Sequence, residues 1–82
     1  MSILDRFLEP NIGKLKEKHD IKGLIRVLSH KDGSMRQNAV IALGELNDTT
    51  AVEPLAASLE DANWDVRLKT AIALKIRIPT RC

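Results

Sequence analysis

The 82-residue chain has few aromatic residues, a single cysteine and no long apolar segment. Phe7 and Trp64 are the only aromatic side chains, so the core has to be built from leucine, isoleucine, valine and alanine, as in helical proteins. No stretch approaches the roughly 20 apolar residues that a membrane-spanning helix needs. Cys82 has no second cysteine with which to form an internal disulfide, which favours a reducing, cytoplasmic setting.

The net charge is also low, at +2. A balance so close to neutrality does not by itself indicate nucleic acid or an anionic membrane as a partner. Basic residues are concentrated between Lys14 and Lys31, but Glu17 and Asp20 interrupt them. We interpret this basic strip as a solvated helix face. Nucleic-acid binding through the strip is kept as an alternative hypothesis.

The chain does contain an internal repeat with a spacing of 31 residues. When residues 21–45 are aligned with residues 52–76, identical residues recur in the same order. The identical pairs are Leu24 and Leu55, Leu28 and Leu59, Arg36 and Arg67, Ile41 and Ile72, Ala42 and Ala73, and Leu43 and Leu74. A period in this range is typical of stacked helical repeats, which usually provide extended binding surfaces rather than catalytic sites.

Capping residues and apolar spacing predict where the helices begin. Asn11, Asp20, Asp32 and Asn63 each stand just before a segment with helical periodicity, and their short polar side chains are favoured at that position. The second copy is expected to start near Thr49 or Thr50, with Val52, Leu55 and Leu59 pointing inward. Pro79 is expected to end the last helix by about residue 78.

These segments predict an all-α fold, a short α-solenoid of two helical hairpins. The expected units are an N-terminal cap at residues 1–19, one repeat at 20–48, a second at 49–78 and a tail at 79–82. Two repeats are fewer than such arrays normally need for stability. We therefore expect the N-terminal cap or a second chain to cover the apolar surface that is left open.

Three segments carry a resemblance to a known family. Val52–Leu55, Asn63–Arg67 and the helix Ala39–Leu46 resemble the short HEAT-like repeats of bilin lyase subunits and many prokaryotic scaffold proteins. The resemblance covers about residues 20–77, and Asn11–His19 resembles the partial repeat that often opens such arrays. It implies the solenoid fold but little about activity, since the same repeat serves lyases, hydroxylases, DNA repair enzymes and plain scaffolds.

The resemblance also implies a structural role for two arginines. In the family, the arginine after the first apolar residue of the second helix reaches acidic residues of neighbouring turns. That role falls here on Arg36 and Arg67. The candidate acidic partners are Asp32, Asp48, Asp61 and Asp65, of which Asp32 and Asp48 are expected to join the repeats together with the arginines.

The sequence offers no catalytic set. His19 precedes Asp20 and His30 precedes Lys31, so the His-Glu pairs that hydroxylases of this repeat type use for iron are missing. No nucleophile stands in a triad-like arrangement, and no glycine-rich phosphate loop is present. The chain is therefore expected to be non-enzymatic, without cofactor or metal. A role as accessory subunit of a lyase-type enzyme is a further alternative.

The last helix is expected to carry an interface. Leu68, Ile72 and Ile76 recur every four residues, and Leu68 and Ile72 lie nearly opposite Val66, Ala73 and Leu74. With Ile41 and Trp64 they predict a patch that binds a protein partner or a second copy of the chain, but no membrane. Two alternatives stay open: the helix could rotate and bury Ile72 or Ile76, and Trp64 could seal the two repeats together. The expected function is a self-associating protein-binding or scaffold module.

Overall fold

A computed structural model describes residues 11–75 of the chain. Its elements are α2 (Ile12–Glu17), α3 (Ile21–Val27), α4 (Gly33–Leu46), the short 3₁₀ helix η1 (Thr49–Ala51), α5 (Val52–Ser58) and α6 (Trp64–Ala73). The described part contains no strand, so the predicted all-α class is confirmed. The division into repeats and a cap stays a prediction, and most of the expected cap lies outside residues 11–75.

Each predicted capping residue begins a helix. The Asn11 and Asp20 side chains accept hydrogen bonds from the amides of Lys14 and Gly23, at 3.1 Å and 3.0 Å. Asp32 and Asn63 accept in the same way from the second residue of α4 and of α6. These bonds satisfy amides that have no partner inside the helix, so these four helices start where the sequence predicts.

The end of the last helix differs from the expectation of about residue 78. Helix α6 stops at Ala73, and Lys75 takes a left-handed conformation with φ 59°. The final turn closes through a hydrogen bond from the Lys75 amide to the carbonyl of Ile72 at 3.0 Å, the tighter i to i+3 pattern that often ends helices. Ile76, the third member of the expected patch, lies outside the described residues.

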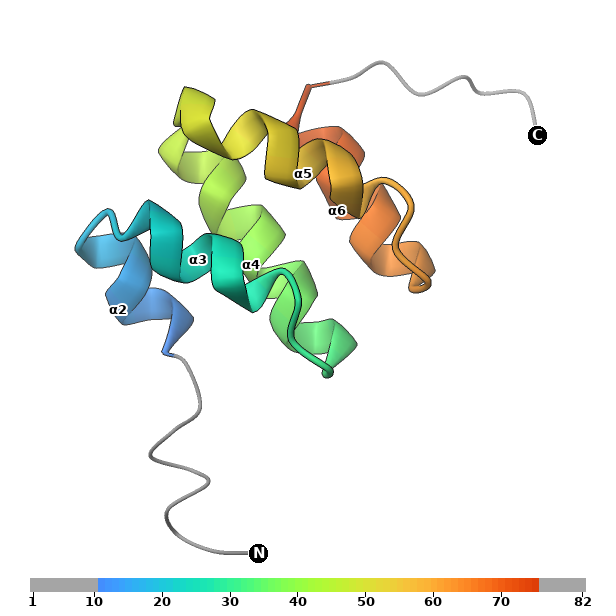
Figure 1. Ribbon diagram of the computed structural model, residues 1–82, viewed down its shortest axis with the longest axis horizontal. Helices are drawn as coiled ribbons and strands as arrows, with labels where there is room; N and C mark the ends of the chain where they lie inside the picture. The colour runs from blue at the N-terminus through green and yellow to red at the C-terminus, as the bar shows by residue number, and fades with distance from the viewer. Residues whose placement is uncertain (1–10, 76–82) are drawn as a thin grey trace, which may run out of the picture.

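The helices form two rows (Figure 1). Helices α4 and α6 pack against each other in one row, while α3 and α5 lie beside them in the other. Helix α2 closes the N-terminal side by contacting both α3 and α4. None of the helices in residues 11–75 has the length and apolar character needed to cross a membrane.

One apolar core runs through both hairpins. Its buried members are Leu24, Val40, Ala42, Leu43, Ala51, Leu55 and Val66. Ile12 and Leu15 of α2 pack against this cluster, so α2 covers one end of the core. The expectation that Val52 points inward is wrong. Its side chain is 49% exposed, because Ala51 at the end of η1 takes the buried position.

Candidate protein-binding surface

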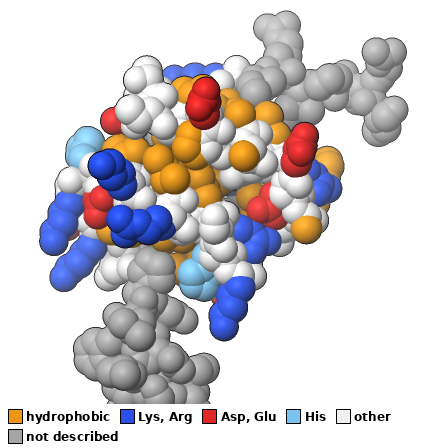
Figure 2. All heavy atoms as spheres, in the orientation of Figure 1, with side chains coloured by type: hydrophobic (Ala, Val, Ile, Leu, Met, Phe, Trp, Pro, Cys, Tyr) orange, Lys and Arg blue, Asp and Glu red, His pale blue; other side chains and the backbone are white. Residues whose placement is uncertain are grey.

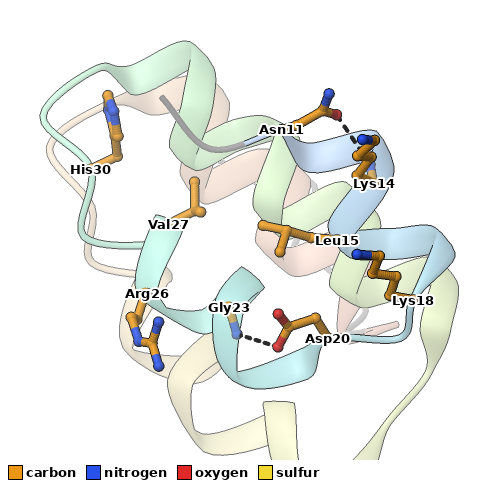
Figure 3. A pocket seen from close by; sticks show the side chains of 9 residues that line it. All are labelled: Asn11, Lys14, Leu15, Lys18, Asp20, Gly23, Arg26, Val27 and His30. Carbon is orange, nitrogen blue, oxygen red and sulfur yellow. Dashed lines mark hydrogen bonds between the residues drawn. The ribbon is translucent and has the colours of Figure 1, made fainter. Parts of the chain in front are cut away.

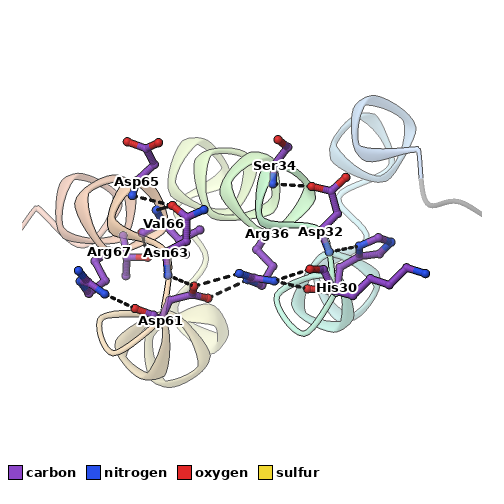
Figure 4. A network of polar contacts seen from close by, with 11 residues as sticks. His30, Asp32, Ser34, Arg36, Asp61, Asn63, Asp65, Val66 and Arg67 are labelled. Atoms are coloured by element: carbon purple, nitrogen blue, oxygen red, sulfur yellow. Dashed lines mark hydrogen bonds and ion pairs between the residues drawn. The ribbon is translucent and has the colours of Figure 1, made fainter.

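A fork of hydrogen bonds joins the two hairpins through Arg36 (Figure 4). Its Nε and Nη2 atoms donate to the two carboxylate oxygens of Asp61 at 2.9 Å and 3.2 Å. Its Nη1 atom donates to the main-chain carbonyls of His30 and Lys31 at 2.6 Å and 3.1 Å. The Arg36 and Asp61 side chains are only 18% and 11% exposed, so water screens this bidentate pair weakly.

Asp61 combines this pairing with a second role in its own turn. Its Oδ1 atom accepts a hydrogen bond from the amide of Asn63 at 2.8 Å, and Asn63 in turn caps α6. Burial opposes ionisation of the carboxyl, but the hydrogen bonds from Asn63 and Arg36 and the charges of Arg36 and Arg67 hold the pKa of Asp61 below its ordinary 3.8. The carboxylate therefore stays charged at neutral pH.

The expectation that Asp32 and Asp48 join the repeats is corrected by the structure. Asp32 accepts from the amide of Ser34 at 2.9 Å, and Asp48 accepts from the amide and hydroxyl of Thr50 at 2.8 Å and 2.6 Å. The Thr50 hydroxyl and then its amide lower the pKa of Asp48. A short side chain held by its own turn does not reach the next hairpin, so Asp61 alone takes that role in the described chain.

Arg67 repeats part of the arrangement around Arg36. Its Nη1 atom donates to the main-chain carbonyl of Asp61, just as Arg36 donates to the carbonyl of His30, and both carbonyls lie six residues before the arginine. The Arg67 guanidinium also lies 5.5 Å from the centre of the Trp64 ring, within cation–π range. Arg67 is thus held in a defined position by Trp64 and by the turn that precedes α6.

The apolar patch expected on the last helix is partly exposed in the structure. Trp64, Ile72 and Ile41 are 66%, 60% and 36% exposed, while Leu68 is half-buried. Val66, on the opposite side of α6, is fully buried. Rotation of α6 that would bury Ile72 is therefore not observed. Trp64 lies at the surface beside the Arg67 guanidinium.

The basic strip is not continuous in the folded chain. Lys14, Lys18 and Arg26 line an open cleft of about 450 Å³ between α2 and α3, together with Asp20 (Figure 3). Lys16 instead forms an ion pair with Glu45. The side chains of Leu15 and Val27 point into this cleft, so its floor is apolar and its rim carries both signs of charge.

A second apolar region of the surface was not predicted from the sequence. A shallow cleft of about 260 Å³ between α3 and α5 is lined by Ile25, Leu28, Pro54 and Ala57, among others. Figure 2 shows apolar side chains gathered on this face, with most of the visible lysine and arginine towards α2. The short alanine side chains of α5 gave no amphipathic signal in the sequence. Within residues 11–75, no cluster of three or more His, Cys, Asp or Glu residues could hold a metal ion.

Two rows of antiparallel helices, joined by an arginine-to-carboxylate pair between equivalent turns, define an α-solenoid repeat protein. The family of HEAT repeats matches residues 12–79, so the chain belongs to that family. HEAT repeats generally mediate protein–protein interaction or scaffolding and are typically non-enzymatic. No curated protein is similar to this chain.

Proposed function

We propose that the chain is a cytoplasmic, non-enzymatic scaffold module that associates with a second copy of itself through the apolar side of α6. The observation that carries this proposal is the position of Ile72, which is 60% exposed on a helix whose opposite side is fully buried at Val66. Ile41 is its counterpart in the first hairpin and is also exposed. The packed helices α4 and α6 therefore present isoleucine from the same repeat position.

The size of this patch suits a modest interaction between folded chains. Burying an aliphatic side chain contributes roughly 1.5 to 3 kcal/mol, and Ile41, Leu68 and Ile72 supply three such side chains. Association itself costs at least about 4 kcal/mol in lost freedom of motion. The balance favours a dimer that dissociates on dilution rather than a permanent assembly.

Light scattering on a sizing column, over a range of protein concentrations and with reductant to keep Cys82 from cross-linking, tests this proposal. We expect a dimer at high concentration that Ile72→Glu converts to a monomer, because the new charge would be buried in the interface. Ala56→Glu, an exposed substitution on α5 in the other helix row, is the matched control and should leave the size unchanged. A monomer at every concentration would contradict self-association.

The alternative partners have less support from the structure. Nucleic-acid binding would require phosphate contacts from Lys14, Lys18 and Arg26, but Asp20 lines the same cleft. Such binding would weaken steeply with salt, so a fluorescence titration with random-sequence DNA at two salt concentrations tests it. An accessory role for a lyase-type enzyme would use the same apolar patch and would appear as a complex with the larger enzyme.

A further inference from the structure

Because of the 31-residue repeat, the hydrogen-bond partners of one arginine indicate which partners its counterpart can bind. Arg36 and Arg67 occupy the same repeat position, and each donates from Nη1 to a main-chain carbonyl six residues earlier. This shared bond holds each guanidinium against the turn that precedes its own helix. The Nε and Nη2 atoms form the outer edge of each guanidinium. The group that accepts hydrogen bonds from this edge in one arginine therefore indicates which group the other arginine can bind.

The outer edges of the two arginines differ. The Nε and Nη2 atoms of Arg36 donate to the Asp61 carboxylate of the following hairpin. Among residues 11–75, Nε and Nη2 of Arg67 donate to no acceptor. Figure 4 shows Arg67 at the end of the helix rows farthest from α2. Within the described residues, the same fork is thus presented outward from the second hairpin.

We propose that Arg67 is the docking point for a carboxylate of a different protein. The partner is a helical hairpin with an aspartate two residues before the cap of its second helix, as Asp61 precedes Asn63 in this chain. Trp64 and Leu68, which precede and follow Arg67 on α6, supply apolar contact beside the ion pair. This inference goes beyond the proposed self-association, which depends on Ile72 and Ile41 and shares only Leu68 with this site.

Within residues 11–75, a second copy of the chain does not offer the required carboxylate. In its first hairpin, His30 stands at the repeat position of Asp61, and its Nδ1 atom already accepts from the amide of Asp32 at 3.0 Å. The Asp61 carboxylate of a second copy is held by its own Arg36. Helix α2 also covers the N-terminal side of the first hairpin with Lys14 and Lys18 at the surface, and these charges repel Arg67.

The chemistry of the fork defines the partner further. A guanidinium presents two parallel N–H groups that match the two oxygens of a carboxylate, whereas a carboxamide supplies only one oxygen and no charge. Trp64 lies against the guanidinium and shields one face from water, which strengthens the pair. An aspartate-bearing turn is therefore preferred over the same turn with asparagine.

A peptide from the chain itself provides a defined probe for this site. We would titrate the intact protein with a peptide of residues 49–63, which carries Asp61 but no aromatic residue, and with the same peptide carrying Asp61→Asn. Nuclear magnetic resonance would follow the Arg67 Nε–H and Trp64 indole N–H signals. We expect saturable shifts of both signals, with affinity about fivefold or more weaker for the asparagine peptide.

Protein variants complete the test. Arg67→Gln should abolish the preference for the aspartate peptide, and Arg67→Lys should retain only part of it because lysine lacks the fork. The matched control Arg26→Gln, an exposed arginine of α3, should bind both peptides as the unchanged protein does. Circular dichroism would show that Arg67→Gln keeps its helices; if it does not, the Arg67→Lys titration decides.

Three results would overturn the proposal: no shift of the Arg67 and Trp64 signals, equal affinity for the two peptides, or loss of a self-associated form in Arg67→Gln. The last would mean that the carboxylate comes from a second copy. The proposed self-association is judged separately by light scattering with Ile72→Glu. A monomeric chain that still prefers the aspartate peptide would refute only self-association.

Discussion

Gly44 of α4 and Ala73 of α6 approach at backbone distance. A Cβ atom added to Gly44 would lie 2.7 Å from the Cβ of Ala73 and 3.0 Å from its Cα. Glycine inside a helix ordinarily costs about 1 kcal/mol relative to alanine. The close approach offsets that cost, because α4 and α6 can come this near to each other only where position 44 has no Cβ atom.

Gly44→Ala should therefore destabilise the protein, although alanine favours helices. We expect the free energy of unfolding to fall by about 1 to 3 kcal/mol, the usual range for overpacking, as measured by urea denaturation. Gly13→Ala is the matched control, since its Cβ would meet only the Asn11 side chain at 3.5 Å. That variant should gain about 0.5 to 1 kcal/mol. Equal effects at the two glycines would contradict the close contact.

Arg36→Gln should loosen the stacking of the two hairpins. The substitution removes the pair with Asp61 and two hydrogen bonds to main-chain carbonyls, and it leaves a poorly exposed carboxylate without its cation. We expect a loss of about 2 kcal/mol in the free energy of unfolding by chemical denaturation. Arg26→Gln, at an exposed position, should change it by less than about 0.5 kcal/mol. Similar losses in both variants would exclude a special role for the pair.

The Asp61 carboxyl should make stability depend on pH in the acid range. Its pKa in the folded chain lies below the ordinary 3.8, so the folded state favours the charged form. The contribution is complete above about pH 5 and is lost as the pH falls through 3.8 towards the folded pKa. Urea midpoints measured from pH 7 to pH 3 should fall for the unchanged protein and fall less for Asp61→Asn. Parallel curves would contradict this assignment.

Residues with positive φ end three of the helices. His19, Asn47 and Lys75 have φ of 53°, 54° and 59°, a conformation that costs a side chain other than glycine roughly 1 to 2 kcal/mol. Asn47→Gly should be nearly neutral because asparagine tolerates this conformation, whereas His19→Gly should raise the thermal midpoint. The control Lys18→Gly, with φ −86°, should lower the midpoint. A lowered midpoint for His19→Gly would count against this interpretation.

Much of the fold could be predicted because its signals are local. Asparagine and aspartate caps act through amides two or three residues away, and a 31-residue repeat is visible in the letters themselves. Helical spacing also favours an exposed Ile72, since Val66 and Ile72 fall on different sides of an ideal helix, but it leaves rotation of the helix open.

The partner of Arg36 could not be predicted in the same way. Four aspartates stand near the arginines. Spacing alone does not show which of them bond only to amides of their own turn and which one reaches an arginine of the other hairpin. The early end of α6 was missed because Lys75 itself is compatible with a helix, and only its observed φ of 59° shows the stop. Val52 was misplaced because η1 shifts the inward position to Ala51.

Helix α4 has a further consequence for how the molecule opens. It contacts α2, α3 and α6, so no helix packed against it can be released without exposing part of α4, whereas α5 packs mainly on α6 and η1. Local opening is easiest where few contacts are lost. The amide hydrogens of α4 should therefore exchange with solvent only when the whole chain unfolds, while those of α5 exchange through smaller fluctuations.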